Sequence, residues 1–329
     1  MRKAILMADS ESVFERVYGA GRKEQLEALV DLYPTIIGSA NFEKHTDFLK
    51  ETEFIFSSWG MPCLKEEQLE KMPKLKAVFY AAGSVKHFAE PLLKRGIIVV
   101  SGWQANAIPV AEFTIAQILL SCKGYFRNAG DCRATELKKG TQTFIGRGNF
   151  GETIGLIGCG AIGRTVIKLL KNFNLKVIVH DPYLSADEAV KLGVENVSLE
   201  ELFKRSYVVS NHLPNIKELA GMLNKKHFSL LREDATFINT ARSPQVAEKE
   251  LLAELKRRPT ITALLDLIEP ENIPEACKMP NVQISAHIAG SLSDELYRMA
   301  DFVMEDFKAF DTGKKMKYSV TSEMLAKMA

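Results

Sequence analysis

The sequence predicts an α/β protein of two domains, each built on a doubly wound parallel sheet. Its 329 residues favour two domains at about 150 residues per domain, and each would be large enough to bury a core of its own. Short apolar runs rich in β-branched residues alternate with longer amphipathic stretches, as parallel strands alternate with crossover helices. A glycine-containing loop at 138–151 separates this alternation into two series.

The first series predicts one α/β unit that ends near Gly102. Helical periodicity is visible at 25–30 and 65–69. The apolar runs between these stretches predict strands at 4–7, 35–38, 54–57, 77–80 and 97–100.

A long helix is predicted at about 109–122, with Pro109 in its first turn, and the second series follows the loop. The last helix, at about 293–310, is expected to start after Ser291 and to stop at Gly313. The second series predicts strands at 153–157, 176–179, 207–210, 236–239, 262–265 and 282–285, with a helix at 247–256 among the elements between them.

Composition excludes several classes of protein. Hydrophobic residues make up 46% and charged residues 26%, and 43 Lys+Arg against 41 Asp+Glu leave a net charge of +2, so neither a disordered chain nor a protein that coats nucleic acid is expected. No apolar run approaches the roughly 18 residues of a membrane-spanning helix, and the N-terminus is not apolar enough for a signal peptide. We therefore expect a soluble, cytoplasmic protein. Without a CxxC pair, reduced and mostly packed thiols are expected, with no metal site, at Cys63, Cys122, Cys132, Cys159 and Cys277.

The strongest local motif is the GxGxxG segment 158–163, which follows a predicted strand and precedes a helix. Gly158 permits the tight turn, Gly160 lets the backbone approach a pyrophosphate, and Gly163 lets helix and strand pack closely. The helix start, with Ala161 and Ile162, offers free N–H groups to phosphates. The alternative is that these glycines only serve a tight turn between strand and helix.

Asp181 closes the following strand at the usual interval of about 20 residues, where a carboxylate accepts hydrogen bonds from the adenosine ribose. Pro182 and Tyr183 follow it in place of Arg or Lys, so NAD is favoured over NADP. The alternative is that Asp181 only caps its strand.

Three further predicted strands end in polar residues. Arg242 follows the strand at 236–239, carboxylates including Asp266 follow the strand at 262–265, and His287 follows the strand at 282–285. Because ligands bind outside the carboxyl ends of strands in open α/β sheets, these segments predict a site that binds an anion and transfers a proton.

At these residues the chain resembles the D-isomer-specific 2-hydroxyacid dehydrogenases, over most of its length and with the motifs in the right order. The segments at 153–163, 239–243, 265–271 and 285–290 resemble the family's cofactor loop and its Asn-x-Ala-Arg-Gly, Leu-Asp-Val-Phe-Glu-x-Glu and Thr-Pro-His-Ile-Ala-Gly segments. Upstream, 75–86 resembles the loop that binds the substrate carboxylate, and 106–112 resembles the start of the interdomain helix.

The resemblance implies an enzyme that interconverts a 2-oxoacid and a D-2-hydroxyacid with NAD(H). Arg242 would bind the carboxylate and carbonyl of the substrate, His287 would be the general acid, and Glu271 would be the carboxylate paired with that histidine. The further substrate-binding residues would be Ala82, Gly83, Ser84 and Asn106. The further cofactor-binding residues would be His212, Leu213, Pro214, Thr240, Ala241, Asp266, His287 and Gly290.

It also implies an architecture and partners. A Rossmann NAD-binding domain, 104–291, would be inserted into a flavodoxin-like substrate domain formed by 1–103 and 292–329, with the final helix crossing back to that domain. The reaction would occur in an interdomain cleft that closes over the substrate. The expected partners are a small 2-oxoacid or 2-hydroxyacid and a second copy of the chain, held through the 109–122 helix, with no nucleic acid and no membrane.

The chain departs from the family pattern in places, and other interpretations stay open. Ser243-Pro244-Gln245 stands where a glycine followed by small or apolar residues is usual, and Ser285-Ala286 replaces Thr-Pro. An NAD(H)-sensing regulator, like the co-repressors that resemble this same family, is the alternative function, and a 3-phosphoglycerate specialist is another. At single residues, Arg242 could be a surface residue, His287 a core histidine, Glu271 part of a solvated acidic loop, Ser84 and Asn106 turn and capping residues, and Trp103 a packing residue.

Overall fold

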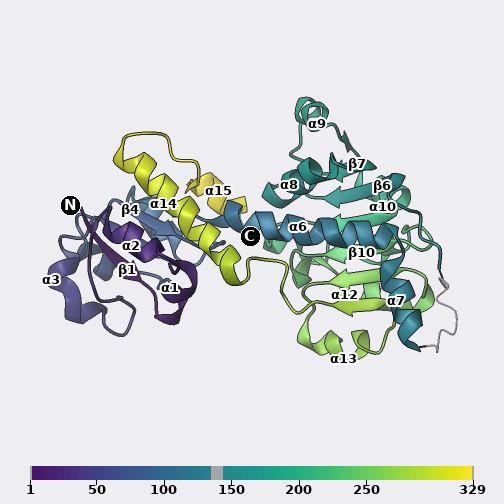
Figure 1. Ribbon diagram of the computed structural model, residues 1–329, viewed down its shortest axis with the longest axis horizontal. Coiled ribbons are helices and arrows are strands. Elements are labelled where there is room, and N and C mark those ends of the chain that lie inside the picture. The colour runs from purple at the N-terminus through teal and green to yellow at the C-terminus, as the bar shows by residue number, and fades with distance from the viewer. Residues whose placement is uncertain (1, 135–143, 328–329) are drawn as a thin grey trace. The chain divides into compact units, whose positions relative to one another are not determined.

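The chain divides into two compact units in the computed structural model, which describes residues 2–134 and 144–327 (Figure 1). Unit 1 comprises Met1–Asn106 and Ser291–Ala329, and unit 2 comprises Ala107–Gly290. These junctions differ by a few residues from the expected limits of 1–103 with 292–329 and 104–291. The side chain of Asn106 accepts a hydrogen bond from the Ser291 N–H at 2.9 Å, so the two ends of unit 1 are tied together at the junctions.

Unit 1 contains a six-stranded sheet in the order β13-β5-β4-β3-β1-β2, parallel except for β13, which runs antiparallel to β5. The order 2-1-3-4-5 of its parallel strands is that of flavodoxin-like sheets. Its elements are β1 (Lys3–Met7), α1 (Ser12–Val17), α2 (Arg22–Glu27), β2 (Asp31–Leu32), the 3-10 helix η1 (Phe42–His45), α3 (Thr46–Leu49), β3 (Phe54–Ser57), α4 (Glu66–Glu70), β4 (Ala77–Tyr80), α5 (Ala89–Lys94), β5 (Ile98–Ser101), η5 (Ser293–Leu296), α14 (Tyr297–Asp311), β13 (Ser319–Val320) and α15 (Ser322–Lys327).

Helices cover both faces of this sheet, because successive strand side chains point to opposite sides. On one face Phe54, Phe56 and Phe79 pack with α1, α2 and α14, and Phe307 of α14 makes edge contacts with all three rings. On the other face Ile55 packs with α3, α4 and α5. Figure 1 shows α14 beside the N-terminal helices, so the helix predicted at about 293–310 lies in the first unit.

One predicted strand of unit 1 is wrong. The structure places β2 at Asp31–Leu32, and within the predicted strand at 35–38 only Ile37 forms an isolated bridge, to Met7. Pro34 has no N–H to offer a ladder, and the Gly38 N–H is taken by the side chain of Asn41 at 2.8 Å, so the segment turns before a strand can form.

Unit 2 contains a seven-stranded, wholly parallel sheet in the order β12-β11-β10-β9-β6-β7-β8. Its elements are α7 (Tyr125–Ala134), β6 (Phe150–Ile157), α8 (Ala161–Leu170), β7 (Asn174–His180), α9 (Ala186–Leu192), β8 (Glu195–Asn196), α10 (Leu199–Arg205), β9 (Val208–Asn211), η2 (Lys217–Leu219), α11 (Lys225–Phe228), β10 (Thr236–Asn239), η3 (Ser243–Gln245), α12 (Glu248–Arg257), β11 (Thr262–Leu265), η4 (Pro270–Asn272), α13 (Ile273–Ala276) and β12 (Val282–Ile284).

Helices α10, α11 and α12 pack on one face of this sheet, and α6 (Trp103–Cys122), α8 and α9 pack on the other. The strand order reverses between β6 and β9, and ligands bind at such a switch point, outside the carboxyl ends of the strands. The predicted class of two doubly wound α/β domains, one of them a Rossmann domain, is confirmed. Part of the predicted loop 138–151, residues 138–143, lies outside the described residues.

Helix α6 begins at Trp103, six residues earlier than predicted, so Pro109 lies inside the helix and not in its first turn. It is also long and apolar enough, with a mean hydropathy of 1.3, to cross a membrane by length and composition, which the count of uninterrupted apolar residues missed. However, 61% of that window is buried inside the protein, as in the central helix of a folded domain.

Two of the five cysteines are packed and three are exposed. Cys122 and Cys159 are buried, and burial raises the pKa of the Cys122 thiol to about 12. Cys63, Cys132 and Cys277 are exposed, so the expectation of mostly packed thiols is wrong for the majority.

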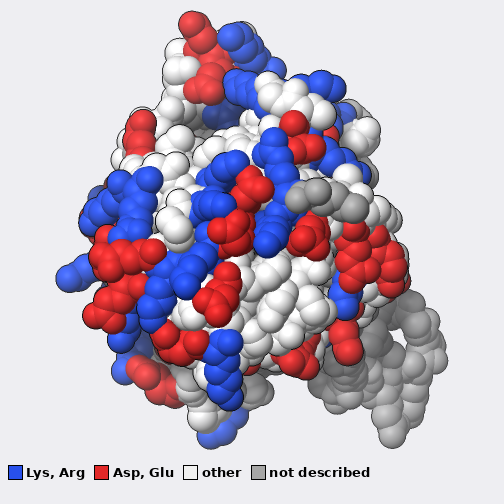
Figure 2. Space-filling view, turned by 90° about the vertical axis from the view of Figure 1, so that its left-hand side faces the viewer, with Lys and Arg blue, Asp and Glu red and all other residues white. Residues whose placement is uncertain are grey.

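Positive and negative side chains are interspersed on the face of the protein shown in Figure 2. Ion pairs join Lys71 to Glu43 and Lys74 to Glu51, both at 2.6 Å. Exposed pairs of this kind contribute little to stability, but they explain how 26% charged residues produce a surface of mixed sign.

Candidate functional site

The loop from β6 to α8 has the backbone shape that the GxGxxG motif predicts. Gly158 has φ +93°, and a Cβ there would lie 2.9 Å from the carbonyl oxygen of His212. A Cβ on Gly163 would collide with the Gly158 carbonyl oxygen, so α8 could not pack this closely on the loop. A Cβ on Gly160 would meet no protein atom within 4 Å. Space is therefore kept above Gly160, where the backbone at the start of α8 can approach a pyrophosphate.

Asp181 lies beside this loop. Its Oδ2 accepts a hydrogen bond from the Cys159 N–H at 2.7 Å, and its Oδ1 accepts one from the Tyr183 N–H at 2.8 Å. Each oxygen keeps a second acceptor position, which suits a ribose diol. The glycine cradle and this carboxylate together fit a dinucleotide.

His212 lies across from the loop at the end of β9. Its N–H donates to the Ile157 carbonyl at 2.8 Å, and the Leu213 N–H donates to the side chain of Asn211 at 3.1 Å. The imidazole is buried, and among the described residues neither ring nitrogen has a hydrogen-bond partner. Burial lowers the pKa of His212 to about 4, so the ring is neutral near pH 7.

This burial makes stability depend on pH. Below about pH 6.5 the unfolded chain binds a proton that the folded protein does not bind until about pH 4, so the free energy of unfolding falls as pH is lowered through this window. The loss attributable to His212 should reach about 2 kcal/mol at pH 5. We expect His212→Leu to lose correspondingly less stability than wild type between pH 7.5 and pH 5 in denaturant titrations. Parallel losses in the two proteins would contradict the assignment.

The three polar segments of the sequence analysis come together at the carboxyl edge of the sheet. The Asp266 N–H donates to the Asn239 carbonyl at 2.9 Å, and the His287 N–H donates to the Asp266 carbonyl at 2.7 Å. The chain segments after β10, β11 and β12 are thus joined by direct backbone hydrogen bonds. Arg242, Asp266 and His287 are all presented at this one edge.

Asp266 shapes the loop that contains His287. Its buried carboxylate accepts hydrogen bonds from the Ser285 hydroxyl at 2.7 Å, the Ile288 N–H at 2.9 Å and the Ala289 N–H at 3.1 Å. Within this loop Ala286 and His287 have φ values of +56° and +63°, a strained backbone for residues other than glycine. The contacts of Asp266 therefore hold His287 exposed at the edge, and Ala286 takes a φ that the family's proline could not adopt.

Arg242 is exposed, and its Nη1 donates to the Ala241 carbonyl at 2.8 Å. Thr240 and Ala241 are buried beneath it, and the Thr240 hydroxyl lies 3.3 Å from that of Thr114 on α6. The guanidinium of Arg242 is therefore exposed to solvent, while the residues just before it in the chain are buried. Its remaining donors are suited to a planar carboxylate.

Glu271, which the resemblance pairs with His287, forms no hydrogen bond or ion pair with it among the described residues of this structure. Among the described residues, the ion pair of Glu271 is with Lys249 at 3.7 Å, and the Glu271 side chain is 68% exposed. The physical reason is the turn η4, where the neighbouring Asn272 occupies the buried side and leaves Glu271 on the outer side.

In unit 1, the residues expected to bind substrate lie on the loop after β4. The Ser101 hydroxyl lies 2.6 Å from the Gly83 carbonyl oxygen and 3.1 Å from that of Ala82. The carbonyl oxygens of Ala82 and Gly83 are thereby hydrogen-bonded to Ser101, the last residue of β5. Ser84 is exposed, whereas Asn106 bonds to Ser291, next to the half-buried Gly290.

Buried polar residues with no predicted role in the site support it from below. Asn239 Nδ2 donates to the Arg242 carbonyl at 3.2 Å, and its Oδ1 accepts a bond from Asn211 at 3.0 Å. Gln245 and Glu248 are also buried beside the loop after β10. Polar residues at the last position of an otherwise apolar strand were the available signal for Asn211 and Asn239.

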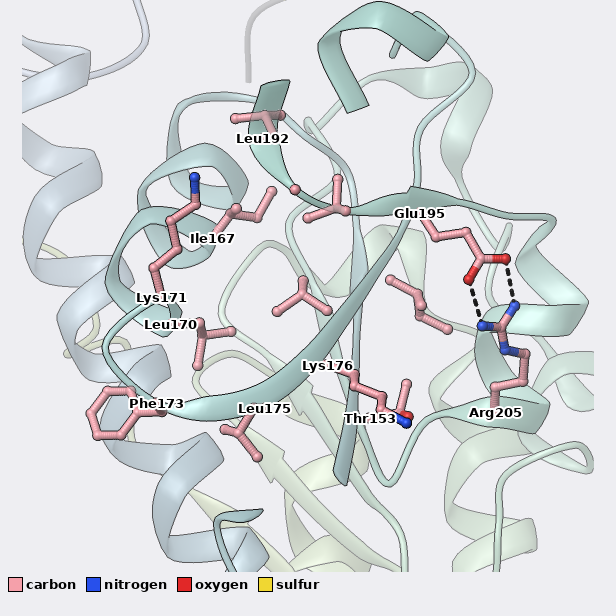
Figure 3. Close-up of a pocket in the computed structure, with 14 residues that line it drawn as sticks. Thr153, Ile167, Leu170, Lys171, Phe173, Leu175, Lys176, Leu192, Glu195 and Arg205 are labelled. Carbon is pink, nitrogen blue, oxygen red and sulfur yellow. Dashed lines mark hydrogen bonds and ion pairs between the residues drawn. The ribbon is translucent and has the colours of Figure 1, made fainter. Parts of the chain in front are cut away.

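A hollow of about 550 Å³ in unit 2 is separate from the candidate site (Figure 3). It runs along the starts of β6 and β7 and the C-terminal half of α8, the opposite ends of these elements from the glycine loop. Figure 3 shows Glu195 and Arg205 paired at its margin. None of the predicted site residues lines it.

The fold and the site define a class: a dinucleotide-binding α/β oxidoreductase with an arginine and a histidine at the carboxyl edge of its Rossmann sheet. Residues 115–289 match the family model of the D-isomer specific 2-hydroxyacid dehydrogenase, NAD binding domain. The chain belongs to this family, which confirms the resemblance, the NAD cofactor and a 2-hydroxyacid dehydrogenase type of oxidoreductase.

Similar proteins agree with this assignment. The chain is 30% identical to glyoxylate reductase of Thermococcus litoralis over 79% of its own length and 81% of the relative's, and 29% identical to that of Korarchaeum cryptofilum over 79% and 80%. A phosphoglycerate oxidoreductase structure from Rhizobium etli has a TM-score of 0.82 at 25% identity, covering 99% of this chain and 100% of that one. The structure of D-2-hydroxyisocaproate dehydrogenase has a TM-score of 0.76 at 25% identity, covering 97% and 100%.

Proposed function

We propose that this protein reversibly interconverts a small 2-oxoacid and the corresponding D-2-hydroxyacid with NAD(H). The observation that carries the proposal is the backbone connection of the Arg242, Asp266 and His287 segments at one edge of the sheet that also holds the glycine loop. A cation for the carboxylate and an imidazole for the proton are the groups that the reaction needs.

When bound, the nicotinamide supplies the hydride. Arg242 binds the substrate carboxylate and polarises the adjacent carbonyl through its guanidinium donors. His287 donates a proton to the carbonyl oxygen during reduction and removes the proton from the hydroxyl during oxidation. In unit 1, we propose Ala82, Gly83 and Ser84 as substrate-binding residues through their N–H groups, because the Ser101 hydroxyl bonds to the carbonyl oxygens of Ala82 and Gly83.

Asp266 differs from the exposed Arg242 and His287 in being buried. Asp266 maintains the His287 loop through its buried carboxylate. The Glu271 carboxylate pairs with Lys249 in this structure. We propose that Glu271 acts, if Lys249 releases it, as the carboxylate that orients His287.

The direct test is an NADH-oxidation screen of the purified protein against glyoxylate, hydroxypyruvate, pyruvate and branched and aromatic 2-oxoacids, repeated with NADPH. We expect reduction of small 2-oxoacids and faster turnover with NADH, because Asp181 repels a ribose phosphate. NADH binding without turnover across the whole panel would contradict the proposal and indicate a regulator. Faster turnover with NADPH would contradict the role of Asp181.

A pair of glycine variants separates cofactor binding from packing. Gly160→Ala should leave the melting temperature unchanged, since its Cβ meets no protein atom, but should raise the Kd for NADH roughly tenfold by obstructing the pyrophosphate. Gly163→Ala should lower stability by roughly 1–3 kcal/mol, because its Cβ collides with the Gly158 carbonyl. Calorimetric titration and thermal unfolding measure the two effects. Equal loss of stability in both variants would contradict this division.

We also propose a homodimer that uses helix α6 and its neighbouring segment. Apolar side chains exposed there in unit 2 are Leu120, Tyr125, Ile145 and Phe150. Such a surface is typical of an interface between subunits. Light scattering during size-exclusion chromatography should give twice the monomer mass, and Phe150→Glu should shift the equilibrium toward monomer.

A further inference from the structure

The segment Ser243-Pro244-Gln245 is one of the places where this chain departs from the family pattern. It forms the short 3-10 helix η3 directly after Arg242. Gln245 occupies a position where an apolar residue is usual, yet its side chain is only 1% exposed. A buried amide must find partners for both its donor and its acceptor, because an unpaired polar group in the interior loses its hydrogen bonds to water without replacing them.

Both halves of the Gln245 amide have partners. Oε1 accepts a hydrogen bond from the Arg242 N–H at 3.1 Å, and Nε2 donates to the Pro214 carbonyl at 3.1 Å. Pro214 belongs to the segment after β9 that the family resemblance assigns to the cofactor. A single buried side chain therefore links the backbone of the substrate-binding arginine to the backbone of the cofactor segment.

Glu248, at the first turn of α12, links the same loop to the next one. Its buried carboxylate accepts hydrogen bonds from the Glu269 N–H at 3.0 Å and from Asn272 Nδ2 at 2.7 Å. Burial raises the pKa of Glu248, and the Ser243 side chain opposes this shift. A glycine at position 243 would lack that side chain.

Backbone hydrogen bonds complete the support of η3. The Gly221 N–H donates to the Pro244 carbonyl at 2.8 Å, and the Leu223 N–H donates to the Gln245 carbonyl at 3.0 Å. The loop is therefore held from three sides, and the Arg242 N–H is the group that depends on the Gln245 side chain alone.

We propose that Gln245 is a positioning residue, which sets where Arg242 stands relative to the cofactor segment and so controls binding of the substrate carboxylate. The inference rests on the proposed function of Arg242. An apolar side chain at 245 would fill the same volume but would leave the Arg242 N–H without its partner. It would also remove one of the two hydrogen bonds that the Pro214 carbonyl accepts, the other coming from the Ile216 N–H at 3.0 Å. The backbone that carries the Arg242 guanidinium would then be held less firmly. Misplacement of the guanidinium by a fraction of an ångström weakens a bidentate contact.

The test compares Gln245→Leu, Gln245→Glu and the control Gln68→Leu. Gln68 caps α4 in unit 1 through its Oε1, which accepts the Lys65 N–H at 2.9 Å, so the control also removes one glutamine hydrogen bond. With the best 2-oxoacid of the screen, we expect Gln245→Leu to raise KM about tenfold, with kcat and the Kd for NADH changed less than threefold. The control should leave all three unchanged. A lowered melting temperature with unchanged KM would show a merely structural role and overturn the proposal.

Gln245→Glu supplies a pH readout that a structural role would not move. A protonated Glu presents one acceptor oxygen and one O–H donor, as the glutamine amide does, whereas the ionised form cannot donate to Pro214. The ratio of variant to wild-type kcat/KM should therefore rise severalfold from pH 8 to pH 5.5. A ratio independent of pH would overturn the proposal.

Hydrogen exchange keeps this test separate from the proposed function. In Gln245→Leu the Arg242 amide should exchange at least tenfold faster than in wild type, followed by mass spectrometry on peptides that cover residues 240–249. If the wild type reduces no 2-oxoacid, the proposed function fails, and faster exchange would still support Gln245 as the residue that holds the loop. Unchanged exchange would overturn the positioning role whatever the activity.

Discussion

Replacing His287 with asparagine is expected to lower kcat for 2-oxoacid reduction by a factor on the order of 10³, which is the usual contribution of a general acid. Asparagine is the informative replacement because His287 has φ +63°, and asparagine tolerates this left-handed backbone better than other residues do. The loop held by Asp266 should therefore keep its shape. Steady-state kinetics measures the loss, and fluorescence titration should give a Kd for NADH within about threefold of wild type.

The matched control is His45→Asn in unit 1, which removes a histidine that contacts the Tyr33 hydroxyl at 3.0 Å. This variant should keep wild-type kcat. A His287→Asn enzyme that retains more than a tenth of wild-type turnover would show that another group, or water, supplies the proton.

Replacing Arg242 with alanine is expected to lower kcat/KM about 10³-fold, equivalent to about 4 kcal/mol of transition-state stabilisation. The guanidinium is exposed and has a protein contact only to the adjacent Ala241 carbonyl among the hydrogen bonds of the described residues, so its removal should cost little stability. Arg242→Lys should recover only part of the loss, because an ammonium keeps the charge but not the planar pair of donors.

Arg257→Lys is the control for this series. Arg257 is exposed near the end of α12 and pairs with Glu254, so the substitution should leave kcat/KM unchanged. Equal activity of Arg242→Lys and wild type would reject bidentate binding, and full activity of Arg242→Ala would reject Arg242 as the carboxylate ligand.

Much of the fold follows from local sequence signals, because each strand of a doubly wound sheet is buried on both faces and appears as an apolar run. The runs at Phe54–Ser57, Ala77–Tyr80, Thr236–Asn239 and Thr262–Leu265 form strands with the predicted bounds. The strands that were missed are short. β8 and β13 have two residues each, too few for a periodic pattern to be visible.

For the site, the sequence was informative where backbone geometry restricts residue type. Gly158 and Gly163 lie where the motif predicts, because a positive φ and a close helix contact each require glycine, and the Asp181 carboxylate lies against the same loop. The spacing from Asp266 could not reveal which side of its turn Glu271 takes, and in this structure its carboxylate pairs with Lys249.

The sequence by itself determined the architecture of two α/β domains, the NAD motif and the strand ends at which Arg242 and His287 stand, since apolar runs and turn residues act over a few neighbouring positions. Only the tertiary structure decided that Gln245 bridges Arg242 to Pro214, that Glu248 links two loops and that Glu271 faces Lys249. The physical reason is that a buried polar side chain takes its partners from segments distant in the chain, and these segments become neighbours only when the strands pair and the helices pack on them.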